Sequence, residues 1–171
     1  MIILPINKIL RRYKYEFFSV NSTTSTMDEA KFKINSVKNN FIILAEKQTK
    51  GRGRRGNKWI SPPGNIYCSI ALFVDVSNSD LLKYVMLVSV AVKRSLEHIG
   101  LADILFKWPN DIYCNNKKIS GVMQEAYFNK FKKQISIIGV GINFLSSPIN
   151  NNYQTTCINE YVKNISREKY F

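Results

Sequence analysis

The sequence of 171 residues has few of the residues that build metal centres or disulfide frameworks. It contains one histidine, His98, and three widely separated cysteines, Cys68, Cys114 and Cys157, with no C-x-x-C pair. This spacing encodes neither a tetrahedral zinc site nor a disulfide-stabilised scaffold. The chain also lacks an apolar run of about 20 residues, so it predicts no membrane-spanning helix. We expect a cytoplasmic protein with reduced thiols.

Acidic residues are also scarce. Twelve aspartates and glutamates stand against 25 lysines and arginines, which gives a net charge of +13. Such an excess favours an anionic partner, including nucleic acid. However, the 18 lysines are scattered along a chain that also has 18 asparagines and 21 isoleucines. Such a composition is typical of a biased nucleotide composition of the gene, which favours the codons of these residues, and not of selection for a binding partner. The seven arginines are more informative, because Arg52, Arg54 and Arg55 fall within four positions.

The hydrophobic pattern predicts one domain of the α/β (α+β) class. With 45% hydrophobic residues the chain can bury a core. Apolar residues recur at steps of three and four in two segments, which predicts helices over residues 26–37 and 80–99. Compact apolar runs predict strands over residues 15–20, 41–45, 66–74, 104–108, 112–114, 119–128 and 135–144. The last three of these runs indicate neighbouring antiparallel strands.

The loop between the second and third expected strands carries most of the chemistry. Residues 51–56 read G-R-G-R-R-G, which matches the dinucleotide-binding pattern G-x-G-x-x-G. A Rossmann loop opens directly into a helix, whereas Pro62 and Pro63 prevent one here. Glycines expose backbone N–H groups, and guanidiniums offer planar charged forks that suit phosphates or a carboxylate. The loop therefore predicts a small anionic ligand, with a solvated or nucleic-acid-binding basic loop as the alternative.

A second segment, K-W-P-N-D at residues 107–111, ends another expected strand. A turn at Pro109 would bring Asp111 close to Lys118 across a tight hairpin. An Asn-Asp pair is also an ordinary turn former. Lysines on both sides of the turn look buried, and burying an unpaired ammonium costs several kcal/mol, roughly. The hairpin is therefore a candidate site.

The third segment is G-V-G-I-N at residues 139–143, at the end of a further strand. Small residues in a strand allow a ligand to approach the backbone closely. Asn143 offers both a donor and an acceptor, which suits the edge of a base.

Together, these segments resemble the biotin–protein ligases, also called biotin–[acetyl-CoA-carboxylase] ligases. The resemblance rests on S-T-M at 25–27, E-K-Q-T-K-G-R-G-R-R-G-N-K-W at 46–59, K-W-P-N-D-I-Y at 107–113, K-K-I-S-G at 117–121 and G-V-G-I-N at 139–143. It implies a mixed, largely antiparallel sheet with helices packed on one face. It also implies a catalytic domain over residues 1–145, followed by a polar tail over 146–171. The family's C-terminal β-barrel domain is expected to be absent or truncated there.

The resemblance implies an ATP- and Mg²⁺-dependent enzyme. It would activate biotin as biotinyl-5′-AMP and pass it to a lysine of a biotin carboxyl carrier domain of a carboxylase. A lipoate–protein ligase, or a non-catalytic binder of biotin or nucleic acid, is the alternative. No helix-turn-helix precedes the motifs, so we expect no specific DNA binding; a homodimer is left open.

The resemblance also assigns roles to individual residues. Met27 departs from the pattern, because the family commonly has Asn there to contact the ureido group. Catalytic roles fall on Lys118, Arg52 and Asp111, and Asp111 is also the expected magnesium ligand. Biotin would be bound by Ser25, Thr26, Gln48, Gly51, Arg52, Arg54, Lys118 and Gly121, and ATP by Arg54, Arg55, Trp59, Asn110 and Asn143.

Overall fold

The computed structural model describes residues 9–10, 12–75, 78–149, 152–163, 165 and 167. Each predicted helix and strand is present, with shifted ends; the first helix, for example, ends at Lys33. The strands are β1 (Glu16–Thr23), β2 (Phe41–Gln48), β3 (Ile66–Val74), β4 (Ile104–Lys107), β5 (Asp111–Cys114), β6 (Lys117–Phe128) and β7 (Gln134–Ile142). The helices are α2 (Thr26–Lys33), α3 (Asn78–His98) and α4 (Ile158–Tyr161), with a 3-10 turn at Arg54–Gly56.

The strands form one seven-stranded sheet in the order β1-β2-β3-β7-β6-β5-β4. Strands β1 and β2 are parallel and are joined by α2, whereas the other neighbours are antiparallel. The predicted mixed, largely antiparallel sheet is confirmed, as is the antiparallel run of β5, β6 and β7. The parallel pair brings the carboxyl ends of β1 and β2 together.

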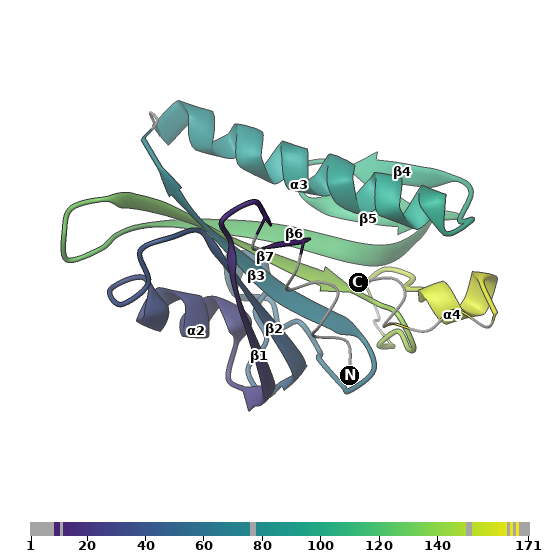
Figure 1. Ribbon diagram of the computed structural model, residues 1–171. Helices are drawn as coiled ribbons and strands as arrows, with labels where there is room; N and C mark the ends of the chain where they lie inside the picture. Colours follow the sequence, from purple (N-terminus) through teal and green to yellow (C-terminus); the bar gives the residue numbers. More distant parts are fainter. Residues whose placement is uncertain are drawn as a thin grey trace.

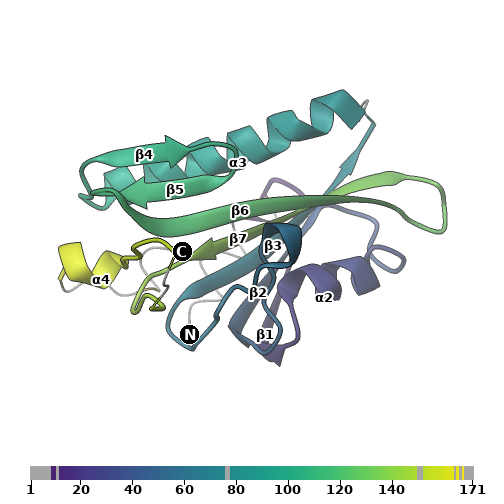
Figure 2. The ribbon, with the colours of Figure 1, turned by 180° about the vertical axis from the view of Figure 1, so that it is seen from behind.

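The two long helices cover opposite faces of the sheet (Figures 1 and 2). The core beneath α3 contains Ile138, Val140 and Ile142 of β7. The core beneath α2 contains Ile135 and Ile137 of the same strand. Successive side chains of a strand point to opposite faces, so these two sets define two layers. The expectation of helices on one face is wrong, because an amphipathic pattern shows that a helix is buried but not on which side.

The segment after β7 packs onto the sheet. Thr156, Cys157 and Ile158 are buried, and Ile158 joins the core beneath α3. Of the polar tail expected over 146–171, residues 168–171 lie outside the described part of the chain. In the described part, this segment supplies both core and cavity residues.

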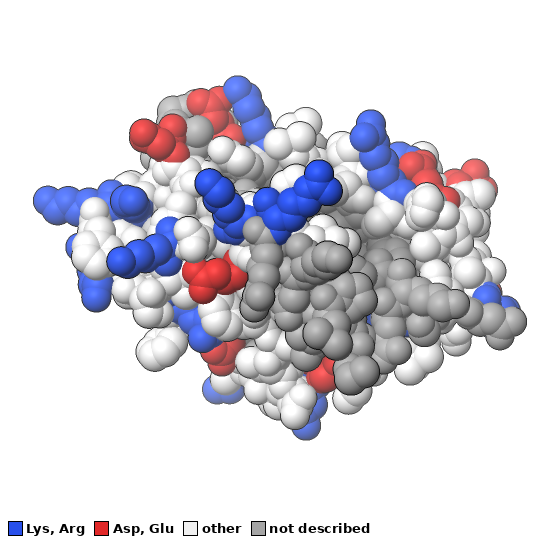
Figure 3. Space-filling view, in the orientation of Figure 1, with Lys and Arg blue, Asp and Glu red and all other residues white. Residues whose placement is uncertain are grey.

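On the face seen in Figure 3, the described basic residues are spread out. Figure 3 shows lysines and arginines on several parts of one face, with acidic side chains between them. A scattered arrangement is less typical of a nucleic-acid interface than a single basic stripe is. None of the described helices is long and apolar enough to cross a bilayer.

Candidate active site

A cavity of 650 Å³ opens on the face of the sheet that carries α2, which is a typical volume for a small-molecule site. Most of the predicted site residues meet in it, although they come from distant parts of the sequence. Gly51 and Asn143 are the exceptions and lie outside the lining. The predicted residues that line the cavity are Ser25, Thr26, Gln48, Arg52, Arg54, Arg55, Trp59, Asn110, Asp111, Lys118 and Gly121.

One end of the cavity, which we call the neutral end, consists of Ser25, Thr26 and Gln48. Ser25 caps α2, since its Oγ accepts a hydrogen bond from the Met27 backbone N at 3.2 Å. Gln48 Oε1 accepts from the Thr26 backbone N at 2.8 Å, while Gln48 Nε2 donates to Ser61 Oγ at 3.0 Å. These polar groups lie where β1 and β2 end, and they are held in place before any ligand binds.

Met27 adds an apolar surface to the neutral end. Its side chain is 4% exposed and lines the cavity. A Cβ placed on Gly139 would lie 2.8 Å from Met27 Sδ, so the thioether packs directly on the β7 backbone. This position therefore presents sulfur and carbon to a ligand, and no amide.

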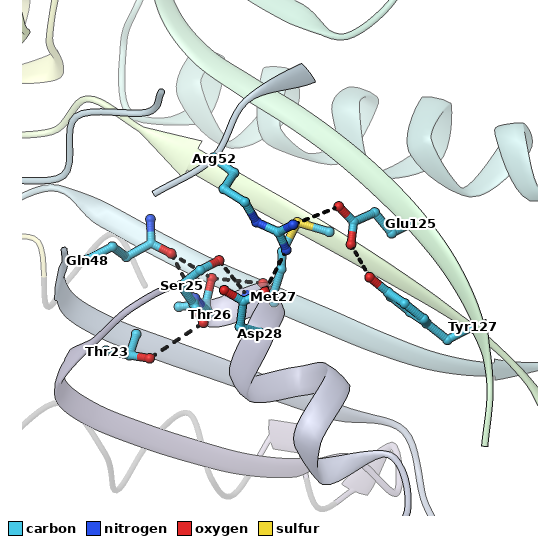
Figure 4. Close-up of polar contacts among 10 residues, drawn as sticks. Thr23, Ser25, Thr26, Met27, Asp28, Gln48, Arg52, Glu125 and Tyr127 are labelled. Atoms are coloured by element: carbon cyan, nitrogen blue, oxygen red, sulfur yellow. Dashed lines mark hydrogen bonds and ion pairs between the residues drawn. The ribbon is translucent and has the colours of Figure 1, made fainter. Parts of the chain in front are cut away.

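Arg52 is held by carboxylates from two elements (Figure 4). Its Nη2 lies 2.7 Å from Asp28 Oδ1 on α2, and its Nη1 lies 3.4 Å from Glu125 Oε1 on β6. The hydroxyl of Tyr127 donates to Glu125 in turn. The sequence predicts that Arg52 contacts biotin, whereas the structure places its guanidinium between two carboxylates. In this structure it joins the loop to α2 and β6.

The rest of the loop is a short turn and not the start of an α-helix. Arg54–Gly56 forms a 3-10 turn in which Arg55 adopts a left-handed φ of 55°. The interpretation that this G-x-G-x-x-G is not a Rossmann loop is therefore confirmed. Arg54 Nη1 donates to Asn110 Oδ1 at 3.1 Å, and Arg55 is exposed at the mouth of the cavity.

The opposite, cationic end is built around Lys118. The predicted proximity of Asp111 and Lys118 is confirmed, since Lys118 Nζ lies 2.7 Å from Asp111 Oδ2. The turn that brings them together lies at residues 115–116 between β5 and β6, whereas the turn at Pro109 joins β4 to β5. The Lys118 side chain is only 12% exposed. Two aromatic rings also face the ammonium, with centroids 5.4 Å away for Trp59 and 5.1 Å away for Tyr153. Sequence reasoning missed Tyr153; the available signal was a large aromatic residue in an Asn-rich segment.

Trp59 forms part of the cavity wall and packs over two facing glycines. Gly121 of β6 and Gly141 of β7 pair across the sheet. A Cβ at Gly141 would lie 2.5 Å from Trp59 Cε2, and one at Gly121 would lie 3.0 Å from Trp59 Cζ3. Only glycine allows this approach, so the small residues expected to admit a ligand first admit the indole.

Gly51 and Asn143 do not line the cavity, but they hold in place backbone segments that form it. A Cβ at Gly51 would lie 2.3 Å from the backbone oxygen of Trp59, so the loop can fold back only with glycine there. Asn143 is 1% exposed, and its Nδ2 donates to the Thr156 backbone oxygen at 3.0 Å. Its Oδ1 is buried without a partner among the described residues.

Nucleophilic and metal-ligating side chains are few among the described residues of the lining. Cys68 lines the cavity, but burial raises the pKa of its thiol to about 12, so it is not a thiolate at neutral pH. Cys114 is fully buried. Among the described residues, no group of three or more His, Cys, Asp or Glu side chains could hold a metal ion. Asp111 is the one carboxylate among the described lining residues.

Comparisons with known proteins identify the family and the fold. A model of the biotin/lipoate A/B protein ligase family matches residues 17–143. The chain is 33% identical to biotin–protein ligase 2 of Arabidopsis thaliana over 83% of its own length and 43% of the relative. It resembles a biotin protein ligase from Aquifex aeolicus in complex with biotin and ATP (TM-score 0.73, 31% identity), covering 91% of this chain and 65% of that one.

A second solved structure, a biotin protein ligase from Leishmania major in complex with biotin, gives a TM-score of 0.72 at 27% identity. That likeness covers 85% of this chain and 63% of the other. The chain thus spans less than half of the Arabidopsis relative and under two thirds of each solved structure. The family match covers most of the chain itself, and the chain belongs to the biotin/lipoate A/B protein ligase family.

Proposed function

We propose that this chain activates biotin with ATP and transfers it to a lysine of a biotin carboxyl carrier domain. The observation that carries the proposal is the charge of the cavity. Among the described lining residues, one carboxylate, Asp111, stands against five cationic side chains, those of Arg52, Arg54, Arg55, Lys58 and Lys118. A lining of this kind suits a reaction between two anions.

In the first step, a carboxylate oxygen of biotin attacks the α-phosphorus of ATP. The new bond is the acyl–phosphate bond of biotinyl-5′-AMP, and the bond that breaks releases pyrophosphate. The reacting groups repel each other, so cations placed beside both of them lower the barrier. We assign Lys118 to the reacting carboxylate and α-phosphate, and Arg54 and Arg55 to the phosphates. We assign Arg52 an indirect role, because its ion pairs hold the arginine loop against α2 and β6.

The neutral end suits the ureido group of biotin, which carries two N–H donors and one carbonyl acceptor. Ser25, Thr26 and Gln48 supply complementary oxygens and N–H groups. Met27 supplies no such group, so we expect one hydrogen bond fewer than an amide there would give.

In the second step, the amine of the carrier lysine attacks the carbonyl carbon, and AMP leaves. Asp111 lies beside the reacting centre and is the group that we assign to the amine proton or to Mg²⁺. Mg²⁺ in such sites is held by one or two carboxylates together with substrate phosphates. A lining with a single carboxylate fits an ion carried by ATP better than a preformed metal cage.

The test is pyrophosphate exchange into ATP, measured with biotin, followed by labelling of a carrier domain with labelled biotin. We expect exchange that depends on biotin. Because the family model covers both biotin and lipoate ligases, exchange with lipoate alone would move the assignment to lipoate. Salt-sensitive binding of DNA or RNA without exchange would favour a non-catalytic binder. A homodimer and the absence of specific DNA binding stay predictions.

A further inference from the structure

The ammonium of Lys118 is enclosed on several sides by groups from three separate segments. Asp111 forms an ion pair with it from β5, Trp59 faces it from the arginine loop, and Tyr153 faces it from the segment after β7. Both ring centroids lie within the distance of about 6 Å at which a cation–π interaction is effective. All four residues line the cavity.

The segment that carries Tyr153 is attached to the backbone of Lys118 itself. The Lys118 backbone N donates to the Gln154 oxygen at 2.9 Å, and the Thr156 backbone N donates to the Lys118 oxygen at 2.9 Å. Thr155 between them forms an isolated parallel bridge with Lys118. The position of the ring and the position of the lysine are therefore coupled through two short backbone contacts.

The same segment is fixed to the core, so the ring does not depend on a free loop end. Asn143 Nδ2 donates to the Thr156 oxygen at 3.0 Å, and the Ile158 backbone N donates to the Asn143 oxygen at 3.0 Å. Thr156 and Ile158 are fully buried. The buried Asn143 thus holds the segment through hydrogen bonds separate from those to Lys118.

Tyr153 faces the ammonium as a neutral phenol. Burial raises the pKa of its hydroxyl, and the charges of Asp111 and Tyr113 raise it further. A neutral ring offers the negative face of its π system and excludes water, and it leaves the positive charge uncompensated. This differs from the ion pair with Asp111, which partly neutralises the same ammonium.

We propose that Tyr153 is a positioning residue that, together with Trp59, holds the Lys118 ammonium between two rings and directs it into the cavity. The proposal rests on the proposed function, because that function makes Lys118 the cation at the reacting carboxylate. It gives the Asn-rich segment after β7 a role in the chemistry.

Nuclear magnetic resonance of ¹³C-dimethylated lysines tests the arrangement without any activity assay. Dimethylation keeps the positive charge, and the Lys118 signal is identified by its loss in Lys118→Arg. We expect this signal to be shifted upfield by the ring currents of both aromatics. Tyr153→Leu should move it downfield, toward exposed lysines, whereas Tyr153→Phe should leave it in place. An identical Lys118 signal in the wild type and Tyr153→Leu would overturn the proposal.

Phe131→Leu is the matched control, because Phe131 is exposed and does not line the cavity. The Phe131 ring centroid lies 5.1 Å from Lys130 Nζ, so its removal should shift the Lys130 signal and leave the Lys118 signal unchanged. A shift of both signals in this control would show that loss of any aromatic ring disturbs the lysines generally, and it would count against a specific role for Tyr153.

Activity supplies a second measurement. Tyr153→Leu should lower kcat for biotin-dependent pyrophosphate exchange by about tenfold, with full recovery in Tyr153→Phe. Equal rates in the wild type and Tyr153→Leu would overturn the role. If the wild type itself shows no exchange, the proposed function fails, while the lysine signals still decide whether Tyr153 positions Lys118.

Discussion

The two ends of the cavity are prepared for a ligand in different ways. At the neutral end, Ser25, Thr26 and Gln48 already hydrogen-bond to their neighbours, so a ligand has to exchange existing bonds for new ones. At the cationic end, Lys118 has one carboxylate partner and two rings, and it keeps a face toward the cavity. The neutral end offers a fixed pattern of donors and acceptors, whereas the cationic end offers charge.

This difference separates recognition from reaction. Hydrogen-bonding groups far from the reacting atoms bind the substrate about equally in the ground state and in the transition state. Their loss therefore changes KM more than kcat. A cation beside atoms whose charge changes binds the transition state more strongly, which affects kcat. The variants below, taken from the largest expected effect to the smallest, test that separation.

Lys118→Ala should have the largest effect. Loss of the cation at the reacting groups should lower kcat for adenylate formation by about 10²–10³-fold, with a smaller change in KM for biotin. Pyrophosphate exchange measures both constants, and circular dichroism checks that the fold is retained. Lys107→Ala is the control, since Lys107 is an exposed lysine on the neighbouring strand β4 and does not line the cavity. Wild-type rates in Lys118→Ala would remove this residue from the mechanism.

Gly141→Ala should displace Trp59 from the wall of the cavity. The new Cβ would lie 2.5 Å from the indole, and overpacking of this kind costs about 1–3 kcal/mol. We expect a lower free energy of unfolding in urea, a changed tryptophan emission and slower exchange. The double variant Gly141→Ala with Trp59→Phe should recover part of the stability, because the smaller ring leaves room. Unchanged stability and emission would contradict the close packing described above.

Gln48→Leu tests the neutral end. It leaves the Thr26 backbone N–H without its partner, which should lower the free energy of unfolding by about 1–3 kcal/mol. The KM for biotin should rise while kcat changes little. Gln48→Glu is the matched variant, because it keeps an acceptor for Thr26 and loses the donor to Ser61. A fall in kcat at constant KM would show that the two ends are not separable.

The pair Arg52–Asp28 should show the smallest effect. Both side chains are about two-fifths exposed, and ion pairs at this exposure contribute about 0.2–1 kcal/mol. A double-mutant cycle with Arg52→Gln and Asp28→Asn, measured by urea unfolding, should give a coupling in that range. The coupling should weaken at about 1 M salt through screening. A coupling that salt leaves unchanged would mean that the contact is not an exposed ion pair.

Local sequence patterns predicted the helices and strands, and part of the candidate site, well. The apolar run at residues 66–74 matches β3, and Asp111 lies against Lys118 as expected, although across the turn at residues 115–116 and not the one at Pro109. Both predictions depend on neighbours in the chain, which turn geometry and strand periodicity determine. Lys107 was wrongly expected to be buried, because its strand lies at the edge of the sheet and exposes that side chain.

Features that depend on distant contacts could not be predicted. The pairing of Arg52 with Asp28 and Glu125 joins positions far apart in the sequence, and no local pattern encodes it. The same holds for Tyr153, whose segment looks like a polar tail until Thr156 and Ile158 are seen to be buried. The side of the sheet on which each helix lies also follows from connections and not from periodicity.

The parallel pairing of β1 and β2 has a further consequence. It is the one parallel pair among the seven strands described, and Ser25, Thr26 and Gln48 lie at its end. Lys118 and Asp111 belong to the antiparallel half of the sheet. Under the proposed function, substitutions in this region would alter which vitamin is accepted without changing the residues assigned to its activation. Substrate choice and chemistry would then be two independently adjustable parts of one small domain.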